Sequence, residues 1–207
     1  MTYIVAFGSS NTYGAWDMDQ GGWVNRIASY IRKENDVIYN CGVSGDTTAD
    51  LLKRFNTECE ARAKEAIEYK EQFVLVFSIG LNDSYLLDGK PKITEKQFET
   101  NLNKLIATAK SYTKKIFFIE ISPVNELETS PIRDNKHVAY RNSRIVKYNE
   151  ILDRVCKKNN LKIIPVYNTL RKGRNGVLYD GLHLNSKGHK IMADAVKKAL
   201  IKEKIIS

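Results

Sequence analysis

Phe73-Val74-Leu75-Val76-Phe77 is an unbroken apolar run of strand-forming residues. It lacks the polar–apolar alternation of a half-exposed strand, which indicates a strand covered on both faces, as in a parallel sheet between helices. Further runs rich in strand-forming residues lie on either side of it along the chain, at 3–7, 37–39, 116–121 and 162–166. The sequence therefore predicts five strands.

Longer stretches between these runs repeat apolar residues at helical spacing, at 23–32, 47–69, 94–111, 140–158 and 186–201. Strands that alternate with helices favour parallel pairing, with right-handed crossovers. This order predicts an α/β fold, a three-layer α/β/α sandwich around a five-stranded, doubly wound parallel sheet of the flavodoxin-like kind. We find no internal repeat, linker or low-complexity tract, so residues 1–207 are predicted to form a single domain.

Hydrophobic residues make up 43% and charged residues 28% of the 207 residues, which is typical of a soluble globular protein and excludes disorder as the main state. No stretch approaches the ~20 apolar residues of a membrane span. The N-terminal apolar run is too short for a signal peptide. The three cysteines form no CxxC pair, which argues against a disulfide framework or a zinc site. We therefore expect a cytoplasmic protein without a metal.

The net charge is +9, from 33 Lys and Arg against 24 Asp and Glu. A positive surface can attract nucleic acid, anionic lipid or an acidic substrate. The lysines are scattered with acids between them, however, rather than gathered in the stripe typical of nucleic-acid binders. We therefore interpret the charge as a solubilising surface and expect no nucleic-acid partner. The alternative, a basic nucleic-acid binder, predicts an affinity that falls steeply with salt.

In such sheets the ligand site lies beyond the carboxyl ends of the strands. In the last loop at this edge, Asp180 stands three residues before His183, with Gly181 between them. A carboxylate at that spacing in a turn can bind one ring nitrogen and leave the other free to face a nucleophile. A solvated loop histidine beside an acid is the alternative interpretation. His137 lies among polar residues of the irregular stretch at 123–137 and is interpreted as a surface residue, and His189 lacks an acid at a useful spacing.

The first loop, Gly8-Ser9-Ser10-Asn11-Thr12, follows a buried strand and is predicted to open a helix or turn. A serine at this place exposes its hydroxyl and turns its backbone N–H toward the site. Helix capping is the alternative, since Ser, Asn and Thr are common caps. A phosphate-binding loop is disfavoured because the Walker lysine and the Gly-x-Gly-x-x-Gly pattern are absent. The spacing also differs from the Gly-x-Ser-x-Gly of α/β-hydrolases.

Acyl transfer needs hydrogen-bond donors for a developing oxyanion, usually a backbone N–H and a side-chain amide. Gly45, in the loop at 42–46, can offer the first, because a glycine lets a substrate approach closely. Asn82, in the loop at 80–83, can offer the second. An ordinary turn residue is the alternative for Asn82.

These four loops together resemble those of one enzyme family. The loops hold Phe-Gly-Ser-Ser-Asn-Thr-Tyr-Gly at 7–14, Asn-Cys-Gly-Val-Ser-Gly-Asp-Thr at 40–47, Ile-Gly-Leu-Asn-Asp at 79–83 and Asp-Gly-Leu-His-Leu-Asn at 180–185. Their order and context are similar to those of the SGNH hydrolases, also called GDSL-type lipases and acylhydrolases. The resemblance extends from residue 3 to about residue 199.

Carried over residue by residue, the resemblance implies that Ser10 is the nucleophile, His183 the general base and acid, and Asp180 the residue that orients the imidazole. The implied oxyanion donors are the backbone N–H groups of Ser10 and Gly45 and the side chain of Asn82. No metal or cofactor is implied.

One position departs from the family pattern, because Ser9 stands where the family usually has Asp. The family does not use that Asp as the attacking group, so the implied triad is unaffected. The rigidity of the turn is in question, because a shorter hydroxyl replaces a carboxylate that can hydrogen-bond the loop.

The resemblance implies a serine-dependent ester hydrolase, an acylhydrolase or esterase that acts on a small-molecule ester through an acyl-enzyme. A carbohydrate deacetylase, or a lysophospholipase or thioesterase of the same family, is the alternative, and a catalytically silent binding module is the alternative from another class. Tyr13, Trp16 and Tyr85 flank the motifs and are candidate substrate-binding residues, although aromatic residues more often serve core packing. The irregular stretch at 123–137 is a candidate lid.

Overall fold

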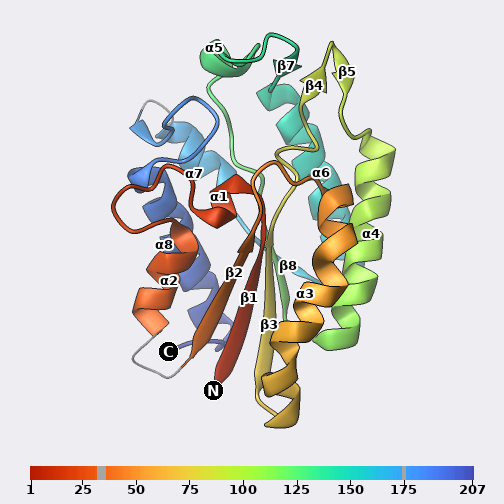
Figure 1. The fold of residues 1–207 in the computed structure, drawn as a ribbon, viewed down its shortest axis with the longest axis vertical. Helices are drawn as coiled ribbons and strands as arrows, with labels where there is room; N and C mark the ends of the chain where they lie inside the picture. Colours follow the sequence, from red (N-terminus) through yellow and green to blue (C-terminus); the bar gives the residue numbers. More distant parts are fainter. Residues whose placement is uncertain (32–35, 174–175) are drawn as a thin grey trace.

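The main sheet has the predicted topology. The computed structural model describes residues 1–31, 36–173 and 176–207. Five parallel strands pair in the order β2-β1-β3-β6-β8, which is the flavodoxin-like order of a doubly wound sheet. Figure 1 shows this sheet edge-on between two groups of helices. The strands are β1 (Thr2–Gly8), β2 (Val37–Gly42), β3 (Gln72–Ser78), β6 (Ile116–Ile119) and β8 (Lys162–Ile164).

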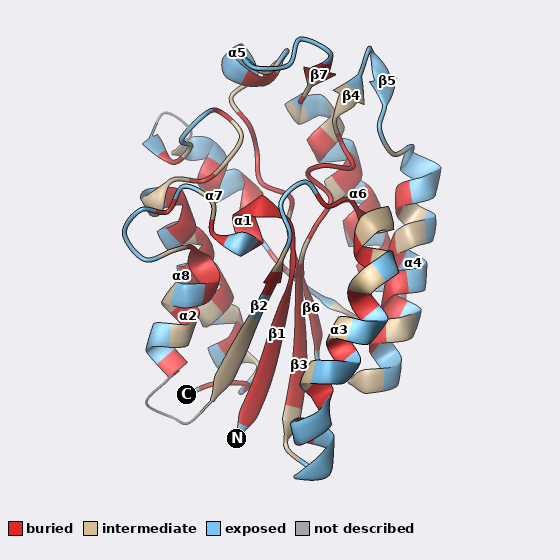
Figure 2. Cartoon of the chain, in the orientation of Figure 1, coloured by how far each residue is buried: buried red, intermediate tan, exposed pale blue. Residues whose placement is uncertain are grey.

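Strand β3 lies in the middle of the sheet and is covered on both faces, as its sequence predicts. Its alternate side chains reach two separate cores. Phe73, Leu75 and Phe77 belong to one core, and Val74 and Val76 belong to the other. Figure 2 shows β1, β3 and β6 as a largely buried layer between helices with exposed outer faces. Since both faces are buried, both sets of positions in the strand must be apolar.

Three helices cover each face of the sheet. The face of Phe77 packs against α3 (Thr48–Glu68), α4 (Glu95–Tyr112) and α6 (Asn142–Lys158), and the face of Val76 packs against α2 (Trp23–Ile31), α7 (Tyr167–Lys172) and α8 (Ser186–Lys202). The first group stands to the right of the sheet in Figure 1 and the second to the left. This arrangement is the predicted α/β/α sandwich.

Some element boundaries differ from the prediction. The predicted strands at 116–121 and 162–166 end earlier, at Ile119 and Ile164. The Glu120 carboxylate accepts hydrogen bonds from the N–H groups of Val166 and Tyr167, at 2.9 and 2.8 Å, and so caps α7, which the sequence analysis missed. The predicted helix at 23–32 extends at least to Ile31, and its last residue lies outside the described residues.

A small second sheet stands above the carboxyl edge of the main one, and the sequence analysis did not predict it. It pairs β4 (Leu86–Leu87) with β5 (Lys90–Pro91) and β7 (Val138–Ala139). Asp88 and Gly89 join β4 to β5 with φ angles of 50° and 77°, which is the conformation of a two-residue hairpin turn. The predicted irregular stretch at 123–137 contains a short helix, α5 (Glu126–Thr129).

No helix within the described residues is long and apolar enough to span a membrane.

The ring of Phe77 should contribute strongly to stability, because it is fully buried and stacks at 5.7 and 4.8 Å from the rings of Phe7 and Phe118 on the neighbouring strands. We expect Phe77→Ala to lower the free energy of unfolding by about 3–5 kcal/mol in urea titrations, since it leaves a cavity. Tyr69→Ala, at an exposed ring, is the control and should change the free energy of unfolding by less than about 0.5 kcal/mol. Equal effects of the two substitutions would contradict this account of the core.

Candidate active site

Hydrogen bonds connect the four loops at the carboxyl edge of the sheet. The Val43 N–H donates to the Gly8 carbonyl at 3.0 Å, which connects the second loop to the first. The Asn82 side-chain amide donates to the Asp46 carbonyl, also at 3.0 Å. The side-chain oxygen of Asn11, in the first loop, accepts from the Leu184 N–H at 3.0 Å, which connects the first loop to the last. The structure therefore brings together the loops of Ser10, Gly45, Asn82 and His183.

His183 is held by Asp180, as the spacing predicts. The Asp180 carboxylate accepts from the ring Nδ1 of His183 at 2.7 Å and from the backbone N–H of the same residue at 2.8 Å. Gly181 makes the turn possible with a φ of 81°, in the left-handed region. Burial alone would raise the pKa of Asp180, but its hydrogen bonds from His183 hold that pKa below the usual value. The pair thus keeps a proton on Nδ1 and leaves Nε2 to accept one.

Ser10 begins the short helix α1 (Ser10–Tyr13) directly after β1. It is buried, and its neighbour Ser9 takes the N-cap position. Within the described part of the chain, the Ser9 hydroxyl makes no hydrogen bond that caps α1. Helix capping by its side chain therefore does not account for a serine at position 9. Gly8 must be glycine, because a Cβ there would lie 2.1 Å from the Thr12 hydroxyl and 2.4 Å from a backbone carbonyl.

Two of the three predicted oxyanion donors, Gly45 and Asn82, lie close together, because Asn82 bonds the carbonyl of Asp46, the residue after Gly45. Gly45 has a φ of 85°, and among the described residues no heavy atom lies within 4 Å of the place where its Cβ would stand. The chain there is open to a ligand. Asn82 is buried, and its amide oxygen accepts from the Tyr140 hydroxyl at 3.0 Å while its nitrogen donates to Asp46. Among the residues that the structure describes, the second N–H of this amide has no acceptor, as an oxyanion donor would require. The catalytic roles of these residues stay predictions.

Arg54 of α3 holds the strand ends in place, and the sequence analysis missed it. Its guanidinium donates to the Gly8 carbonyl at 3.2 Å and to the Cys41 carbonyl at 3.0 Å, at the ends of β1 and β2. It also pairs with Asp46 at 2.7 Å and Glu58 at 2.8 Å. A planar guanidinium can bind all these acceptors at once. Nothing in the sequence pattern separates Arg54 from a surface arginine of the same helix.

Asp83 is a buried acid at this edge that the sequence analysis did not assign. Its side chain accepts from the backbone N–H of Thr48 at 3.0 Å and from the Thr48 hydroxyl, at the start of α3. Burial raises the pKa of Asp83 to about 6, although the Thr48 hydrogen bonds oppose that shift. This contact fixes the Asn82 turn against α3.

The loop after α1 is built on two buried polar side chains. The Asp17 carboxylate accepts from the Gly22 N–H at 3.0 Å and forms two hydrogen bonds with the Arg26 guanidinium, at 2.9 and 3.0 Å. His189, which the sequence analysis set aside, is fully buried and contacts the Ala15 carbonyl and the Trp23 N–H at 3.1 and 3.3 Å. Burial lowers the pKa of His189 and favours its neutral form. His189 is therefore a structural residue of this loop.

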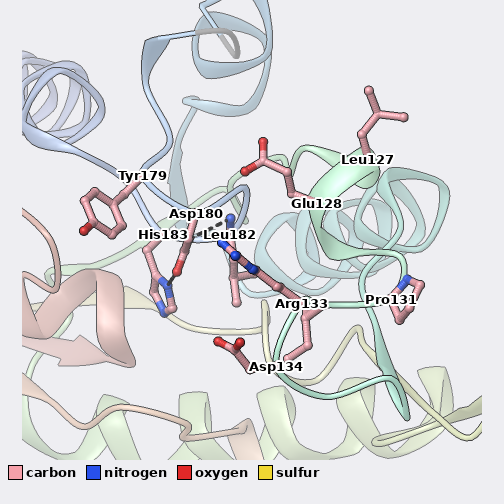
Figure 3. Close-up of a pocket in the computed structure, with 10 residues that line it drawn as sticks. Leu127, Glu128, Pro131, Arg133, Asp134, Tyr179, Asp180, Leu182 and His183 are labelled. Atoms are coloured by element: carbon pink, nitrogen blue, oxygen red, sulfur yellow. Dashed lines mark hydrogen bonds and ion pairs between the residues drawn. The ribbon is translucent and has the colours of Figure 1, made fainter.

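A pocket of about 800 Å³ opens beside His183 and Asp180. The stretch at 127–134 forms its opposite wall, so the candidate lid borders the site (Figure 3). The Asn125 N–H donates to the Gly181 carbonyl at 2.8 Å, which joins this wall to the His183 turn. The lining residues are Leu127, Glu128, Pro131, Ile132, Arg133, Asp134, Tyr179, Asp180, Leu182 and His183. Closure of the lid stays a prediction.

The three candidate substrate residues have different surroundings. Tyr13 is 63% exposed and lies outside the described lining of this pocket, as does Tyr85, which packs against Tyr140 with a ring distance of 5.4 Å. Trp16 stacks flat on Tyr179, at 4.7 Å and 6°. Tyr179 itself lines the pocket and was not predicted, although it stands directly before Asp180 in the sequence.

Within residues 1–31, 36–173 and 176–207, the structure shows no group of three or more His, Cys, Asp or Glu side chains arranged to hold a metal ion.

The five-stranded parallel sheet, with these loops at its carboxyl edge, defines an SGNH hydrolase-like structure. A family model described as GDSL-like lipase/acylhydrolase matches residues 6–191. The chain belongs to this family, which is one of carboxylic ester hydrolases, and the predicted resemblance is confirmed.

Related proteins extend over nearly the whole chain. The lipase/acylhydrolase of Enterococcus faecalis is 25% identical, with a TM-score of 0.75, over 97% of this chain and 95% of its own. The rice GDSL esterase/lipase WDL1 is 23% identical over 95% of this chain and 76% of its own length. The acetylxylan esterase Axe2 of Geobacillus stearothermophilus shares the fold, with a TM-score of 0.69 at 17% identity over 95% of this chain and 92% of its own.

The raised pKa of Asp83 makes a prediction about stability and pH. Because the folded protein binds this proton more tightly than the unfolded chain, the stabilisation from protonation is complete below pH ~4 and disappears as pH rises through about 6. We expect the stability of the wild type relative to Asp83→Asn to fall by about 3 kcal/mol between pH 4 and 7. Urea unfolding of both proteins across this range measures the difference, and a difference that is constant or grows with pH would contradict the prediction.

Proposed function

We propose that the protein is a serine-dependent carboxylic ester hydrolase in which Ser10, His183 and Asp180 form the catalytic triad. The observation that carries the proposal is the hydrogen bond between the Asn11 side chain and the Leu184 N–H. It joins the residue after Ser10 to the residue after His183, while Asp180 orients the imidazole from its other side. Membership of a family of ester hydrolases supports the same reaction.

In the first half of the reaction, neutral His183 accepts the proton of the Ser10 hydroxyl at Nε2 as Ser10 Oγ attacks the ester carbonyl. The negative charge moves to the carbonyl oxygen. The N–H groups of Ser10 and Gly45 and the free amide N–H of Asn82 stabilise it, each by ~3 kcal/mol. Asp180, kept ionised by its low pKa, stabilises the imidazolium that forms.

In the second half, the imidazolium gives its proton to the leaving alcohol, and the C–O bond of the ester breaks to leave an acyl group on Ser10. A water molecule then attacks the acyl-enzyme. His183 takes the proton of that water and returns one to Ser10 Oγ, which releases the carboxylic acid.

The pocket favours a short acyl group and a polar leaving group. Glu128, Arg133 and Asp134 contribute charged side chains to a wall that faces His183 (Figure 3). A long acyl chain laid against this wall would desolvate charged groups without pairing them, which costs free energy. A short acyl group avoids that cost.

An acetylated saccharide is the second candidate substrate. Tyr179 lines the pocket with its ring held flat against Trp16, and such a fixed aromatic face can pack on the apolar face of a sugar ring. The structural likeness to an acetylxylan esterase is compatible with this candidate.

Ser10→Ala should abolish turnover of p-nitrophenyl acetate, because it removes the attacking oxygen. We expect kcat to fall by at least ~10⁴-fold. Ser9→Ala is the matched control at the adjacent hydroxyl and should retain activity within ~3-fold, because Ser9 makes no cap hydrogen bond in the described chain.

Labelling with a fluorophosphonate, followed by mass spectrometry of the peptides, locates the nucleophile independently. The adduct is expected on Ser10. Activity that survives Ser10→Ala and disappears in Ser9→Ala would overturn the assignment. A wild-type protein that is inert on every ester and takes no label would instead support the silent binding module.

The charged pocket wall predicts a steep preference for acyl length. Across p-nitrophenyl esters, kcat/KM for the acetate and butyrate should exceed that for the decanoate by at least ~10-fold, since desolvating even one charged group costs more than 1.4 kcal/mol. A rate that rises steadily with acyl length would refute the short-acyl assignment and point to a lipid substrate.

A further inference from the structure

We propose that Tyr140 is a positioning residue that fixes the amide of Asn82 with its free N–H toward the substrate carbonyl. The inference rests on the proposed function, because it assigns to Asn82 the task of stabilising an oxyanion. Tyr140 touches no reacting atom and acts only through Asn82.

Two contacts hold the Asn82 amide in one orientation. Its nitrogen donates to the Asp46 carbonyl at 3.0 Å, and its oxygen accepts from the Tyr140 hydroxyl at 3.0 Å. All three side chains lie at the buried edge of the site. A rotation of the amide by half a turn would place the Asn82 oxygen against the Asp46 oxygen and aim a lone pair at the developing oxyanion. The Asp46 carbonyl opposes that rotation directly, because it can only accept, and the Tyr140 hydroxyl holds the Asn82 oxygen on the other side.

The Tyr140 hydroxyl keeps its proton under all working conditions. Burial raises the pKa of Tyr140 well above that of a solvated phenol, and the nearby Tyr85 and Asp180 raise it further. Without that hydroxyl the Asn82 oxygen would be buried and unpaired. Unpaired buried acceptors are costly, so the amide would rotate or draw water toward itself.

Tyr140 also connects Asn82 to the pocket wall. Its backbone N–H donates to the Thr129 carbonyl at 2.8 Å, and the Ile132 N–H donates to the Val138 carbonyl at 2.9 Å. Thr129 and Ile132 both lie in the stretch at 127–134 that forms the wall, and Ile132 itself lines the pocket. The segment that shapes the substrate pocket therefore also places the group that orients the Asn82 amide.

The test is a double-mutant cycle of Tyr140→Phe and Asn82→Ala on p-nitrophenyl acetate. Tyr140→Phe should lower kcat by ~10-fold with KM nearly unchanged, less than the ~10²-fold or greater loss expected when Asn82→Ala removes the donor itself. In the Asn82→Ala background, Tyr140→Phe should have no further effect on kcat. Full kcat in a folded Tyr140→Phe protein, or effects that multiply in the double variant, would overturn the proposal.

Tyr112→Phe is the matched control, because the Tyr112 hydroxyl donates to the side-chain oxygen of Asn56 at 2.9 Å at the end of α4, away from the four loops. It should leave kcat unchanged. Thermal unfolding shows that each variant is folded.

An NMR measurement that does not depend on turnover tests the positioning role of Tyr140 separately from the proposed hydrolase activity. The side-chain amide signals of Asn82 in ¹⁵N–¹H spectra should shift in Tyr140→Phe and stay in place in Tyr112→Phe. If the wild type is inert on esters but the Asn82 signals shift in Tyr140→Phe, the proposed hydrolase activity is contradicted and the positioning role is not. If the Asn82 signals are unchanged in Tyr140→Phe, the positioning role is contradicted.

Discussion

The burial of both faces of the parallel sheet is the constraint from which the rest of the molecule follows. Helices cover the side chains of β3 on either side, so neither face can present a ligand site. The carboxyl edge is different, because the loops that leave each strand there must turn toward a helix and carry polar residues. The four loops that hold Ser10, Gly45, Asn82 and His183 meet at this edge because parallel strands all end on the same side.

The elements that the sequence predicts well are those whose signal lies within a few residues. The apolar run at 73–77 identifies a doubly covered strand, and the spacing of Asp180 and His183 predicts their hydrogen bond. The hairpin at Asp88-Gly89 could also be predicted from the sequence, because the Asp-Gly dipeptide is a strong signal for a hairpin turn. It was missed because the flanking strands have only two residues each.

The contacts that the sequence does not reveal join residues far apart in the chain. Arg54 reaches the ends of two strands, and Tyr140 lies 58 residues from the Asn82 that it orients. Neither residue belongs to a local motif. Asp17, Asp83 and His189 likewise look like ordinary polar residues until the fold buries them against backbone N–H and carbonyl groups. A periodic pattern identifies core positions, but it does not identify the buried polar contacts that shape a site.

The pocket wall at 127–134 is fastened at both of its ends. Its N-terminal side is joined to the His183 turn by the hydrogen bond from Asn125 to Gly181, and its C-terminal side is joined to β7 by the hydrogen bond from the Ile132 N–H to the Val138 carbonyl. These hydrogen bonds tie the wall to the loops of the site, and its closure stays a prediction. In this architecture, substitutions at the lining positions of the wall would change the shape and charge of the pocket and leave the contact between Asp180 and His183 in place.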